Sequence, residues 1–278
     1  LADGRTRTIV VEDLDAGQWT VLQGARLSAA ELRAILDPSS TQEDGVELTT
    51  DEEDSYFTGR SVSLSEHSAD VEHNARAFAD ALGLSDSLVE DLALAGWLHD
   101  IGKADRRFQI MLRGGSEIDW RKDETLWAKS AMSSCDKAAQ RRAQARSGYP
   151  AGTRHEVQSL AMIDRHLEWV QGKAHDIELV RFLVASHHGH CRPFAPPVSD
   201  STPVSVQIEA HESERFGTLR LEPVSSDNRL YCLDSQLAER FWNLVAKYGW
   251  LELCWLEAIL RLADHRASEA EQLKGESA

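Results

Sequence analysis

The chain has 278 residues, 42% of them hydrophobic, and a formal net charge of −16. This length and apolar content suit one large domain with an appendage, and they exclude a disordered chain. The acidic balance argues against nucleic-acid binding through overall charge, because a polyanion needs local positive potential.

The charges are unevenly distributed along the chain. Residues 1–58 hold 13 Asp and Glu against 4 Lys and Arg, a balance of −9, whereas residues 103–154 hold 12 Lys and Arg against 6 Asp and Glu, a balance of +6. A solvated helix face is the default interpretation of such a basic stretch. The alternative, an anion-binding track, gains weight if a phosphate site lies beside it.

Neither membrane insertion nor a disulfide framework is expected. No run of about 18 apolar residues occurs, and the N-terminus lacks a basic-then-apolar signal sequence. The four cysteines are widely scattered and form no CxxC pair, which favours a reducing cytoplasm over disulfides or a Cys-type zinc site. The chain begins at Leu1 and not at Met, which indicates a piece of a longer protein.

The first 58 residues differ from the rest in composition. Strand-like, β-branched character marks "TRTIVVEDL" and "QWTVLQG", and a short helix is expected at "SAAELRAIL" with Ser28 as its N-cap. Residues 37–55 are acidic, contain Pro and Ser, and predict a linker. We therefore expect an N-terminal appendage and acidic linker over residues 1–58 and the main domain over residues 59–278.

Helical periodicity dominates from about residue 61. Apolar positions three and four apart predict a first helix closed by Gly83, with Val71, Ala75, Phe78, Ala79 and Leu82 on one face. Similar patterns predict helices at 85–102, 154–172 and 176–188, and a last helix from about Leu251 to Glu271. Alternation at 203–210 and 217–224 predicts a hairpin. The expected fold is all-α, a helical bundle with a small β-hairpin insertion.

The tryptophans are mostly expected in this core. Trp97 and Trp255 both lie on apolar helices, and packing is a more common role there than stacking against a base.

One apolar helix ends in the polar motif "LAGWLHDIGKADRRFQ", residues 93–108. It presents His99 beside Asp100, three residues before Lys103. The motif has two interpretations: a polar helix end turned to water, or a metal site with a cation that faces phosphate.

Other helix ends offer matching ligands. His187 and His188 close one helix immediately before a glycine, His155 opens another, and Asp264 continues the apolar face of the last helix. An unpaired buried carboxylate is costly, and metal ligation would remove that cost. Imidazole and carboxylate together suit Mn, Fe, Co, Ni or Zn better than Ca. A single such histidine is more often a helix cap, so the prediction depends on the whole set.

This ordered set resembles the HD phosphohydrolase superfamily and, more narrowly, the HD nuclease domain of Cas3, the nuclease–helicase of type I CRISPR systems. The resemblance covers about residues 61–270. It is carried by "EHSADV", "HDIGKADRRFQ", "RHEVQSL", "SHHG" and "ADHRAS". Within the first of these, His67 matches the family's H-x-x-D-V pattern and is favoured over the nearby His73. His190 and His265 are expected beside the ligands or exposed.

The resemblance implies an HD-domain fold and a site for two divalent transition-metal ions (Mn²⁺, Fe²⁺, Co²⁺ or Ni²⁺, with Mg²⁺ possible). The first ion would be held by His67, His99, Asp100 and Asp264, and the second by Asp100, His155, His187 and His188. Asp100 would bridge the two ions, which clamp the attacked phosphate. Asp100 and Lys103 are the expected catalytic residues, and the expected substrate contacts are Lys103, Arg106, Arg107, Arg266 and Ser268.

The activity implied is that of a cytoplasmic, metal-dependent nuclease that cleaves single-stranded DNA in CRISPR interference. Its expected partners are the Cas3 helicase domain and the guide-RNA surveillance complex, Cascade. No GxxxxGK[ST] motif occurs in the chain, so the helicase is expected elsewhere in the same parent chain.

Two alternatives remain open. An HD phosphohydrolase acting on nucleotides or cyclic dinucleotides would have a similar metal site but a closed pocket, instead of an open groove flanked by Arg106, Arg107, Arg113 and Arg141. A binding module would keep the HD fold as a scaffold and use metal only for stability.

Overall fold

The computed structural model describes residues 8–13, 18–23 and 56–276. The chain divides into two compact units, residues 1–50 and 51–278. In the first unit, β1 (Thr8–Asp13) pairs antiparallel with β2 (Gln18–Gln23), so both predicted strands are confirmed. The helix predicted near Ser28 and the acidic linker lie outside the described residues. The boundary after residue 58 remains a prediction.

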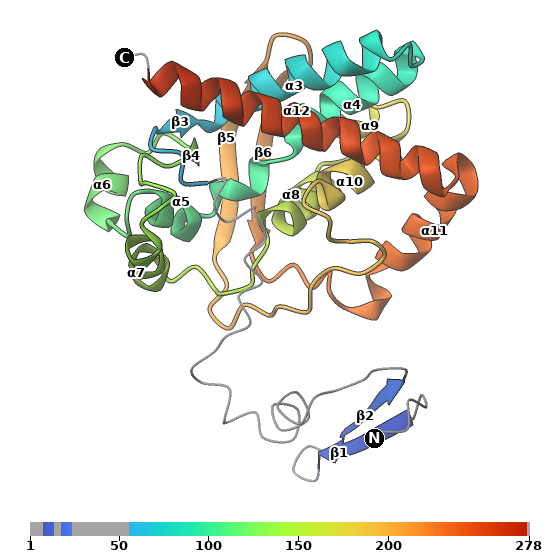
Figure 1. Cartoon of the computed structure of the whole chain (residues 1–278), viewed down its shortest axis with the longest axis horizontal. Helices are drawn as coiled ribbons and strands as arrows, with labels where there is room; N and C mark the ends of the chain where they lie inside the picture. The colour runs from blue at the N-terminus through green and yellow to red at the C-terminus, as the bar shows by residue number, and fades with distance from the viewer. Residues whose placement is uncertain (1–7, 14–17, 24–55, 277–278) are drawn as a thin grey trace. The chain divides into compact units, whose positions relative to one another are not determined.

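The second unit is mostly helical, which confirms the predicted fold class (Figure 1). Its helices are α3 (Leu64–Ala81), α4 (Asp86–Leu98), α5 (Arg106–Leu112), α6 (Glu117–Lys122), α7 (Lys137–Ser147), α8 (His155–Arg165), α9 (Leu167–Gln171), α10 (Ile177–Ser186), α11 (Leu237–Tyr248) and α12 (Trp250–Glu276), with short 3-10 helices η2 (Ile101–Ala104) and η3 (Leu233–Ser235). Its strands are β3 (Val62–Ser63), β4 (Trp127–Lys129), β5 (Ser205–Ser213) and β6 (Gly217–Ser225).

Helix α4 forms the centre of the core. Every residue from 91 to 98 is buried, because this segment is apolar around almost its whole circumference and neighbouring helices cover it on several sides. Helices α3, α10 and α12 pack against it. The α4 backbone leaves helical geometry at Asp100, with φ −105° and ψ 4°, and continues as η2. The metal motif therefore begins where the most buried helix ends.

The start of α10 is tied to α4 by a buried carboxylate. Asp91 accepts hydrogen bonds from the backbone N–H of His175 at 2.7 Å and of Asp176 at 2.8 Å. Asp176 in turn caps α10 by accepting from the N–H groups of Glu178 and Leu179. These bonds satisfy amides that lack partners at a helix start. They fix the axis of α10, whose other end carries His187 and His188.

The predicted hairpin is confirmed as β5 and β6, paired antiparallel with Ser213 opposite Gly217. It packs on the core through ring contacts with Trp97: His211 stacks at 4.6 Å between centroids and Phe216 at 5.7 Å. Trp97 is fully buried, as predicted.

The structure also departs from the predicted elements. The helix predicted over 154–172 is broken at His166 into α8 and α9, where the His166 ring nitrogen accepts a hydrogen bond from the N–H of Glu222. The pair β3 and β4 was not predicted, because each strand is too short to show alternation. It is nevertheless important, since β4 brings Ala128 and Lys129 to the polar centre.

Among the described residues, no helix is long and apolar enough to span a membrane.

Candidate metal centre

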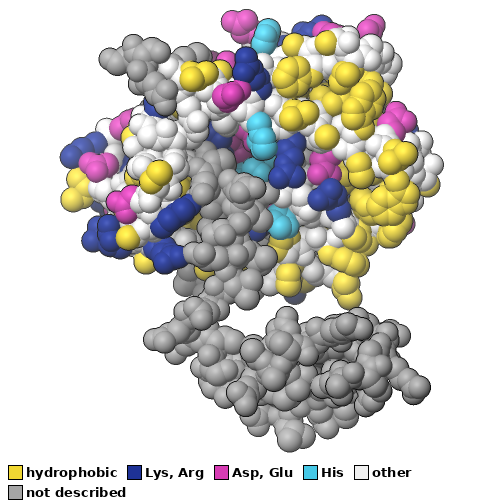
Figure 2. Space-filling model, in the orientation of Figure 1, with side chains coloured by type: hydrophobic (Ala, Val, Ile, Leu, Met, Phe, Trp, Pro, Cys, Tyr) yellow, Lys and Arg dark blue, Asp and Glu magenta, His cyan; other side chains and the backbone are white. Residues whose placement is uncertain are grey.

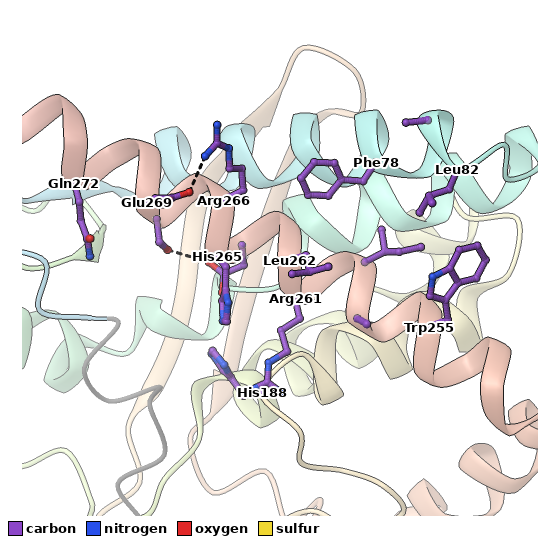
Figure 3. Close-up of a pocket in the computed structure, with 15 residues that line it drawn as sticks. Phe78, Leu82, His188, Trp255, Arg261, Leu262, His265, Arg266, Glu269 and Gln272 are labelled. Carbon is purple, nitrogen blue, oxygen red and sulfur yellow. Dashed lines mark hydrogen bonds and ion pairs between the residues drawn. The ribbon is translucent and has the colours of Figure 1, made fainter.

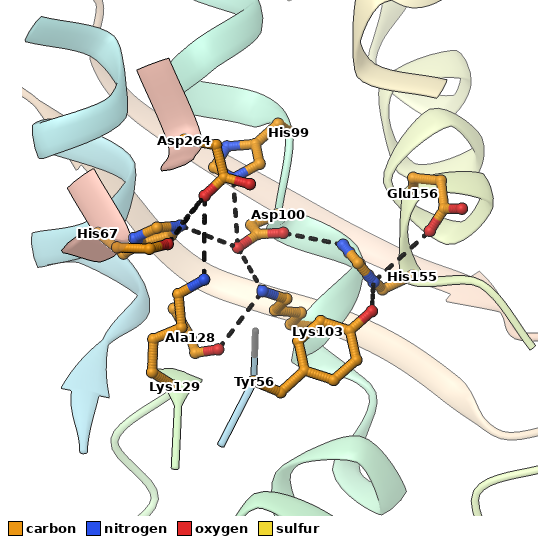
Figure 4. Close-up of polar contacts among 12 residues, drawn as sticks. Tyr56, His67, His99, Asp100, Lys103, Ala128, Lys129, His155, Glu156 and Asp264 are labelled. Atoms are coloured by element: carbon orange, nitrogen blue, oxygen red, sulfur yellow. Dashed lines mark hydrogen bonds and ion pairs between the residues drawn. The ribbon is translucent and has the colours of Figure 1, made fainter. Parts of the chain in front are cut away.

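The structure brings the predicted ligands together from five segments of the chain, and Figure 4 labels those other than His187 and His188. His67 lies on α3, His99 and Asp100 follow α4, and Asp264 lies on α12. The remaining ligands lie at the start of α8 and just after α10: His155, His187 and His188. All seven side chains are buried. Their burial excludes the simple interpretation of a polar helix end turned to water.

The first group of donors surrounds one oxygen of Asp100. Its Oδ2 lies 3.3 Å from His99 Nε2 and 3.5 Å from His67 Nε2. His67 Nε2 is also 3.1 Å from Asp264 Oδ1. One donor atom from each of His67, His99 and Asp100 lies within 4.8 Å of the others, close enough to share one ion.

The second group consists of three histidines on the other side of Asp100. One donor atom from each of His155, His187 and His188 lies within 4.8 Å of the others. Asp100 Oδ1 approaches this group, 2.9 Å from His155 Nε2. Because its two oxygens face different groups, Asp100 lies between two potential metal positions.

Hydrogen bonds to the Nδ1 atoms fix the imidazole rings. His99 Nδ1 lies 2.7 Å from the carbonyl oxygen of Gly96, and His187 Nδ1 lies 2.7 Å from that of Val184. A carbonyl oxygen can only accept, so both Nδ1 atoms carry the proton and the neutral rings present an Nε2 lone pair. Those Nε2 atoms are buried and have no hydrogen-bond partner. Buried acceptors of this kind fit metal coordination.

His67 and His155 are held by side chains instead. His67 Nδ1 lies 2.8 Å from Oε1 of Glu271, a residue of α12 that is fully buried. His155 Nδ1 lies 3.1 Å from the hydroxyl of Tyr56 and 3.5 Å from a carboxylate oxygen of Glu156. A carboxylate behind an imidazole orients the ring and raises its basicity as a ligand.

The protonation states suit a cation. Burial lowers the pKa of His155 to about 4 and holds the pKa values of His187 and His188 well below their ordinary range, so these rings are neutral at pH 7. Burial alone would raise the pKa of Asp100 and of Asp264. Lys103 beside Asp100 and Lys129 beside Asp264 nevertheless keep both pKa values well below normal. The site thus combines ionised carboxylates with neutral imidazole rings at His155, His187 and His188, a donor set that fits a divalent transition metal.

Two buried lysines face the carboxylates. Lys103 Nζ donates to Asp100 Oδ2 at 2.6 Å and lies 3.4 Å from the Ala128 carbonyl oxygen. Lys129, from β4, places its Nζ 3.9 Å from Asp264 Oδ1. Lys103 was predicted from the motif, whereas Lys129 was missed. The sequence "LWAKSAM" does not indicate that its lysine is buried. The lysine lies beside Asp264 only because β4 pairs with β3.

Glu271 and Tyr56 were missed as well. Glu271 follows Asp264 by seven residues, two helical turns, so its place on the same face of α12 was available as a signal. Tyr56 carries no such signal.

Of the predicted substrate contacts, the structure brings two more close to the cluster. Ser268 Oγ lies 3.4 Å from Asp264 Oδ1. Arg266, two residues before Ser268, is exposed on α12 and pairs with Glu269 at 2.6 Å.

The arginines of the basic stretch are engaged elsewhere. Arg106 is exposed and pairs with Glu117. Arg107 is buried, with its guanidinium bonded to Asp105 at 2.8 Å and to Asp200 at 2.7 Å. Arg113 is buried against the Trp127 ring and donates to backbone carbonyls. Arg141 is exposed on α7. Arg107 and Arg113 are thus held by internal contacts, and the groove that the four residues are expected to flank stays a prediction.

The remaining histidines agree with their expected places. His73 is exposed and lies outside the cluster, whereas His67 lies within it. His265 is exposed and His190 is half-buried.

A pocket of about 930 Å³ opens beside the cluster along α12 (Figure 3). We call it the α12 pocket. His188 and Asp264 lie near its middle, between Gln272 at one end and Phe78, Leu82 and Trp255 at the other. Trp255 is 43% exposed and Leu82 is 49% exposed, so the prediction that both belong to the core is wrong. The apolar face of α12 that packs inward is a different one, formed by Leu256, Ile259, Leu260 and Ala263.

The comparisons with known proteins identify the family. A family model described as "Cas3, HD domain" matches residues 51–271, most of the chain. No curated protein and no solved structure is significantly similar to the chain. The family match implies a metal-dependent HD phosphohydrolase or nuclease, in agreement with the histidine and aspartate cluster. The chain belongs to the Cas3 HD-domain family.

Proposed function

We propose that the protein is a metal-dependent nuclease that hydrolyses phosphodiester bonds of single-stranded DNA. The observation that carries the proposal is Asp100, whose two carboxylate oxygens face two separate groups of buried donors. Such an arrangement suits two ions that share one carboxylate and act on one phosphate. His67, His99 and Asp264 would complete the first position, and the three histidines at the start of α8 and after α10 would complete the second.

Bound at these positions, two divalent ions of the Mn²⁺, Fe²⁺, Co²⁺ or Ni²⁺ class, with Mg²⁺ as an alternative, would activate water and polarise the phosphate. The protein contributes rigid ligands. Because their Nδ1 protons are held by Gly96 and Val184, the rings of His99 and His187 cannot turn away. The arrangement is thus preorganised, which reduces the reorganisation required when substrate binds.

Lys103 has a second role in this proposal. Its ammonium is buried and bonded to Asp100 at 2.6 Å, so it fixes the bridging carboxylate. A positive charge held at this place would also offset the negative charge that develops on the phosphate oxygens during attack. Ser268 and Arg266, which line the pocket together with Asp264, would contact the phosphates of the strand.

We further propose that the protein acts in the cytoplasm in CRISPR interference, with a Cas3 helicase domain of the same parent chain supplying the single strand and Cascade directing it. The family match supports this assignment. It does not rest on the basic stretch at 103–154, whose arginines are largely paired within the protein.

The alternative of a nucleotide or cyclic-dinucleotide phosphohydrolase is favoured by one observation. A pocket of about 930 Å³ is large enough to enclose a small molecule, since ligand pockets commonly measure about 300–1,000 Å³. Incubation with Mn²⁺ and either circular single-stranded DNA or a panel of nucleotides separates the two. The nuclease proposal requires cleavage of the circular single-stranded DNA, which has no free ends.

The variant Asp100→Ala tests the nuclease proposal directly. We expect cleavage of circular single-stranded DNA to be lost, because both metal positions lose the shared ligand, while circular dichroism still reports a folded helical domain. Asp80→Ala, at an exposed position of α3, is the matched control and should cleave normally. Undiminished cleavage by Asp100→Ala would refute the proposal. Metal analysis of the purified protein tests both enzymatic proposals, because the absence of a bound transition metal, together with no loss of melting temperature on chelation, would contradict them.

A further inference from the structure

We infer that the α12 pocket binds unpaired nucleobases of the strand whose phosphate reaches the metal cluster, with Trp255 as the stacking surface. The inference rests on the proposed nuclease function and adds a base-binding site to it. It would make the enzyme selective for single strands, since bases paired within a duplex cannot enter the pocket separately.

The pocket is continuous with the metal centre. Asp264 and His188 belong to the cluster and also line the pocket (Figure 3). Ser268, bonded to Asp264, lies on the same wall. A chain that occupies the pocket therefore passes beside the donor groups. This continuity identifies the occupant as part of the substrate itself.

The far end of the pocket exposes unusually large apolar side chains. Leu262 is 59% exposed, Trp255 43% and Leu82 49%, and Phe78 lies beside them. Trp255 and Leu262 are seven residues apart on α12, and Phe78 and Leu82 are four apart on α3, so two adjacent helices each present one apolar stripe. Figure 2 shows hydrophobic side chains gathered on this side of the molecule, next to the histidines. Clustered apolar exposure of this kind marks a binding surface.

The basic side chains along the pocket suit the phosphates of a polyanion, and its apolar end suits the apolar faces of the bases. Arg261 lies on the pocket wall between Asp264 and Trp255, and His265 and Arg266 lie on the other side of Asp264, against one carboxylate outside the cluster, Glu269. The Arg266–Glu269 pair has side chains 59% and 61% exposed, so it contributes little stability and can open to a phosphate. Basic groups that follow a backbone, combined with an aromatic platform for bases, are the usual means of holding single-stranded nucleic acid.

The geometry also predicts which nucleotide is held. Trp255 precedes Asp264 by nine residues, about 13 Å along the helix axis. This distance places the indole beside a neighbouring nucleotide and not beside the attacked phosphate. Stacking on an indole is possible for any base, so the pocket would not select a sequence.

Binding of a fluorescent single-stranded oligonucleotide of mixed sequence in the presence of EDTA tests the site without cleavage. We expect Trp255→Ala to weaken binding about 5- to 100-fold, the range for a base stacked on an aromatic side chain, and Trp255→Phe to restore most of it. Trp242→Ala is the matched control, because Trp242 is 51% exposed on α11 and does not line the pocket. It should bind within twofold of the wild type. Melting temperatures verify that each variant is folded.

A second measurement locates the base. An oligonucleotide with a single cleavable phosphodiester, its other linkages being phosphorothioates, is prepared with an abasic nucleotide at each successive position. With Mn²⁺, the wild type should lose cleavage rate at one or two fixed positions on one side of the cleavable bond. Trp255→Ala should show no further loss at those positions, because the same contact is already missing.

The outcomes separate the inference from the proposed function. If the wild type cleaves DNA but Trp255→Ala behaves like Trp242→Ala, the inference is wrong and the nuclease stands. Trp255-dependent binding without any cleavage upholds the site and refutes the nuclease. A variant that changes only the oligomeric state would show that the pocket holds protein, which also overturns the inference.

Discussion

The histidines of the metal centre depend on the group that contacts the Nδ1 atom of each ring. His99 and His187 donate from Nδ1 to a carbonyl three residues earlier in the helix that they end, so the backbone itself fixes their tautomer. His67 instead depends on Glu271, a residue 204 positions away in the chain. A ring held by backbone keeps its place after most substitutions, whereas a ring held by one carboxylate does not. His67 is therefore the ligand most sensitive to change in its support.

Glu271→Gln should weaken metal binding about 10-fold or more, because the amide keeps the shape of the side chain but removes the negative charge behind His67. Titration of the metal-free protein with Mn²⁺ or Co²⁺, followed by calorimetry or by the visible spectrum of Co²⁺, measures the change. Glu269→Gln is the control, being exposed on the same helix. Equal affinities for the two variants would show that Glu271 has only a packing role.

For Lys129 we expect a substitution that strengthens metal binding, in contrast to Glu271→Gln, which weakens it. Its ammonium is buried 3.9 Å from Asp264 and occupies the neighbourhood of the first metal position. Two positive charges at a few ångströms repel strongly where water is excluded. Lys129→Met should therefore tighten binding of a divalent ion, by about 10-fold, and lower the melting temperature of the metal-free protein, in which Asp264 loses its counter-charge. Lys122→Met, on an exposed lysine, should change neither. Weaker metal binding by Lys129→Met would contradict this account.

At the scale of elements, the site is assembled from helix ends. Helices α4 and α10 end at ligands and α8 begins with one, and at such ends the backbone departs from helical geometry, so neighbouring side chains can converge. The close approach of η2 to α8 depends on Gly102. Its amide donates to Ser159 Oγ at 2.8 Å, and that hydroxyl lies 2.7 Å from the His99 carbonyl oxygen. This contact sets the spacing between Asp100 and His155.

Gly102→Ala should disrupt that spacing. A Cβ at this position would lie 2.0 Å from the His155 carbonyl oxygen and 2.6 Å from the Ser159 nitrogen, both of them backbone atoms that cannot swing away. Overpacking of this kind costs about 1–3 kcal/mol and more where backbone must move. We expect a clear fall in melting temperature, measured by calorimetry, together with weakened metal binding.

Gly172→Ala provides the comparison for this substitution. Gly172 closes α9 with φ −68°, and its added Cβ would make only ordinary contacts at 3.4 Å or more. It should melt within a few degrees of the wild type. The account of Gly102 fails if the two variants have the same stability.

At the scale of the whole molecule, the basic stretch shows that sequence charge and surface charge differ. The balance of +6 over residues 103–154 suggested an anion track. Folding buries Arg107 and Arg113 in contacts with carboxylates and carbonyls, and both Lys103 and Lys129 turn inward. The arginines that line the α12 pocket, Arg261 and Arg266, come instead from α12, a stretch with no basic excess.

The stability of the whole domain should depend on pH through its buried neutral histidines. Burial lowers the pKa of His211 to about 4, although its hydrogen bond to the Trp97 carbonyl opposes the shift. In the unfolded chain the same ring titrates near 6.5, so between pH 6.5 and 4 the unfolded state binds more protons. The free energy of unfolding must therefore fall as pH falls through this window, by up to about 3 kcal/mol for this residue alone.

Denaturant unfolding of the metal-free protein at pH 7 and pH 5 measures this dependence. His211→Phe keeps a ring against Trp97 and should show a smaller loss between the two pH values. His73→Phe, at an exposed position, should behave as the wild type does. An unchanged pH dependence in His211→Phe would exclude this histidine as a source.

The sequence by itself determined the local features: the helical periodicity, the β5–β6 hairpin and the polar motif at 99–103, because each follows from residue types at fixed short spacing. The set of ligands was implied by the family resemblance. The tertiary structure decided what depends on distant segments. It placed Glu271 behind His67, brought Lys129 from a strand too short to predict, engaged Arg107 with Asp200, and left Trp255 exposed beside the cluster. Spacing along a helix defines its faces, but only packing against other elements decides which face is covered.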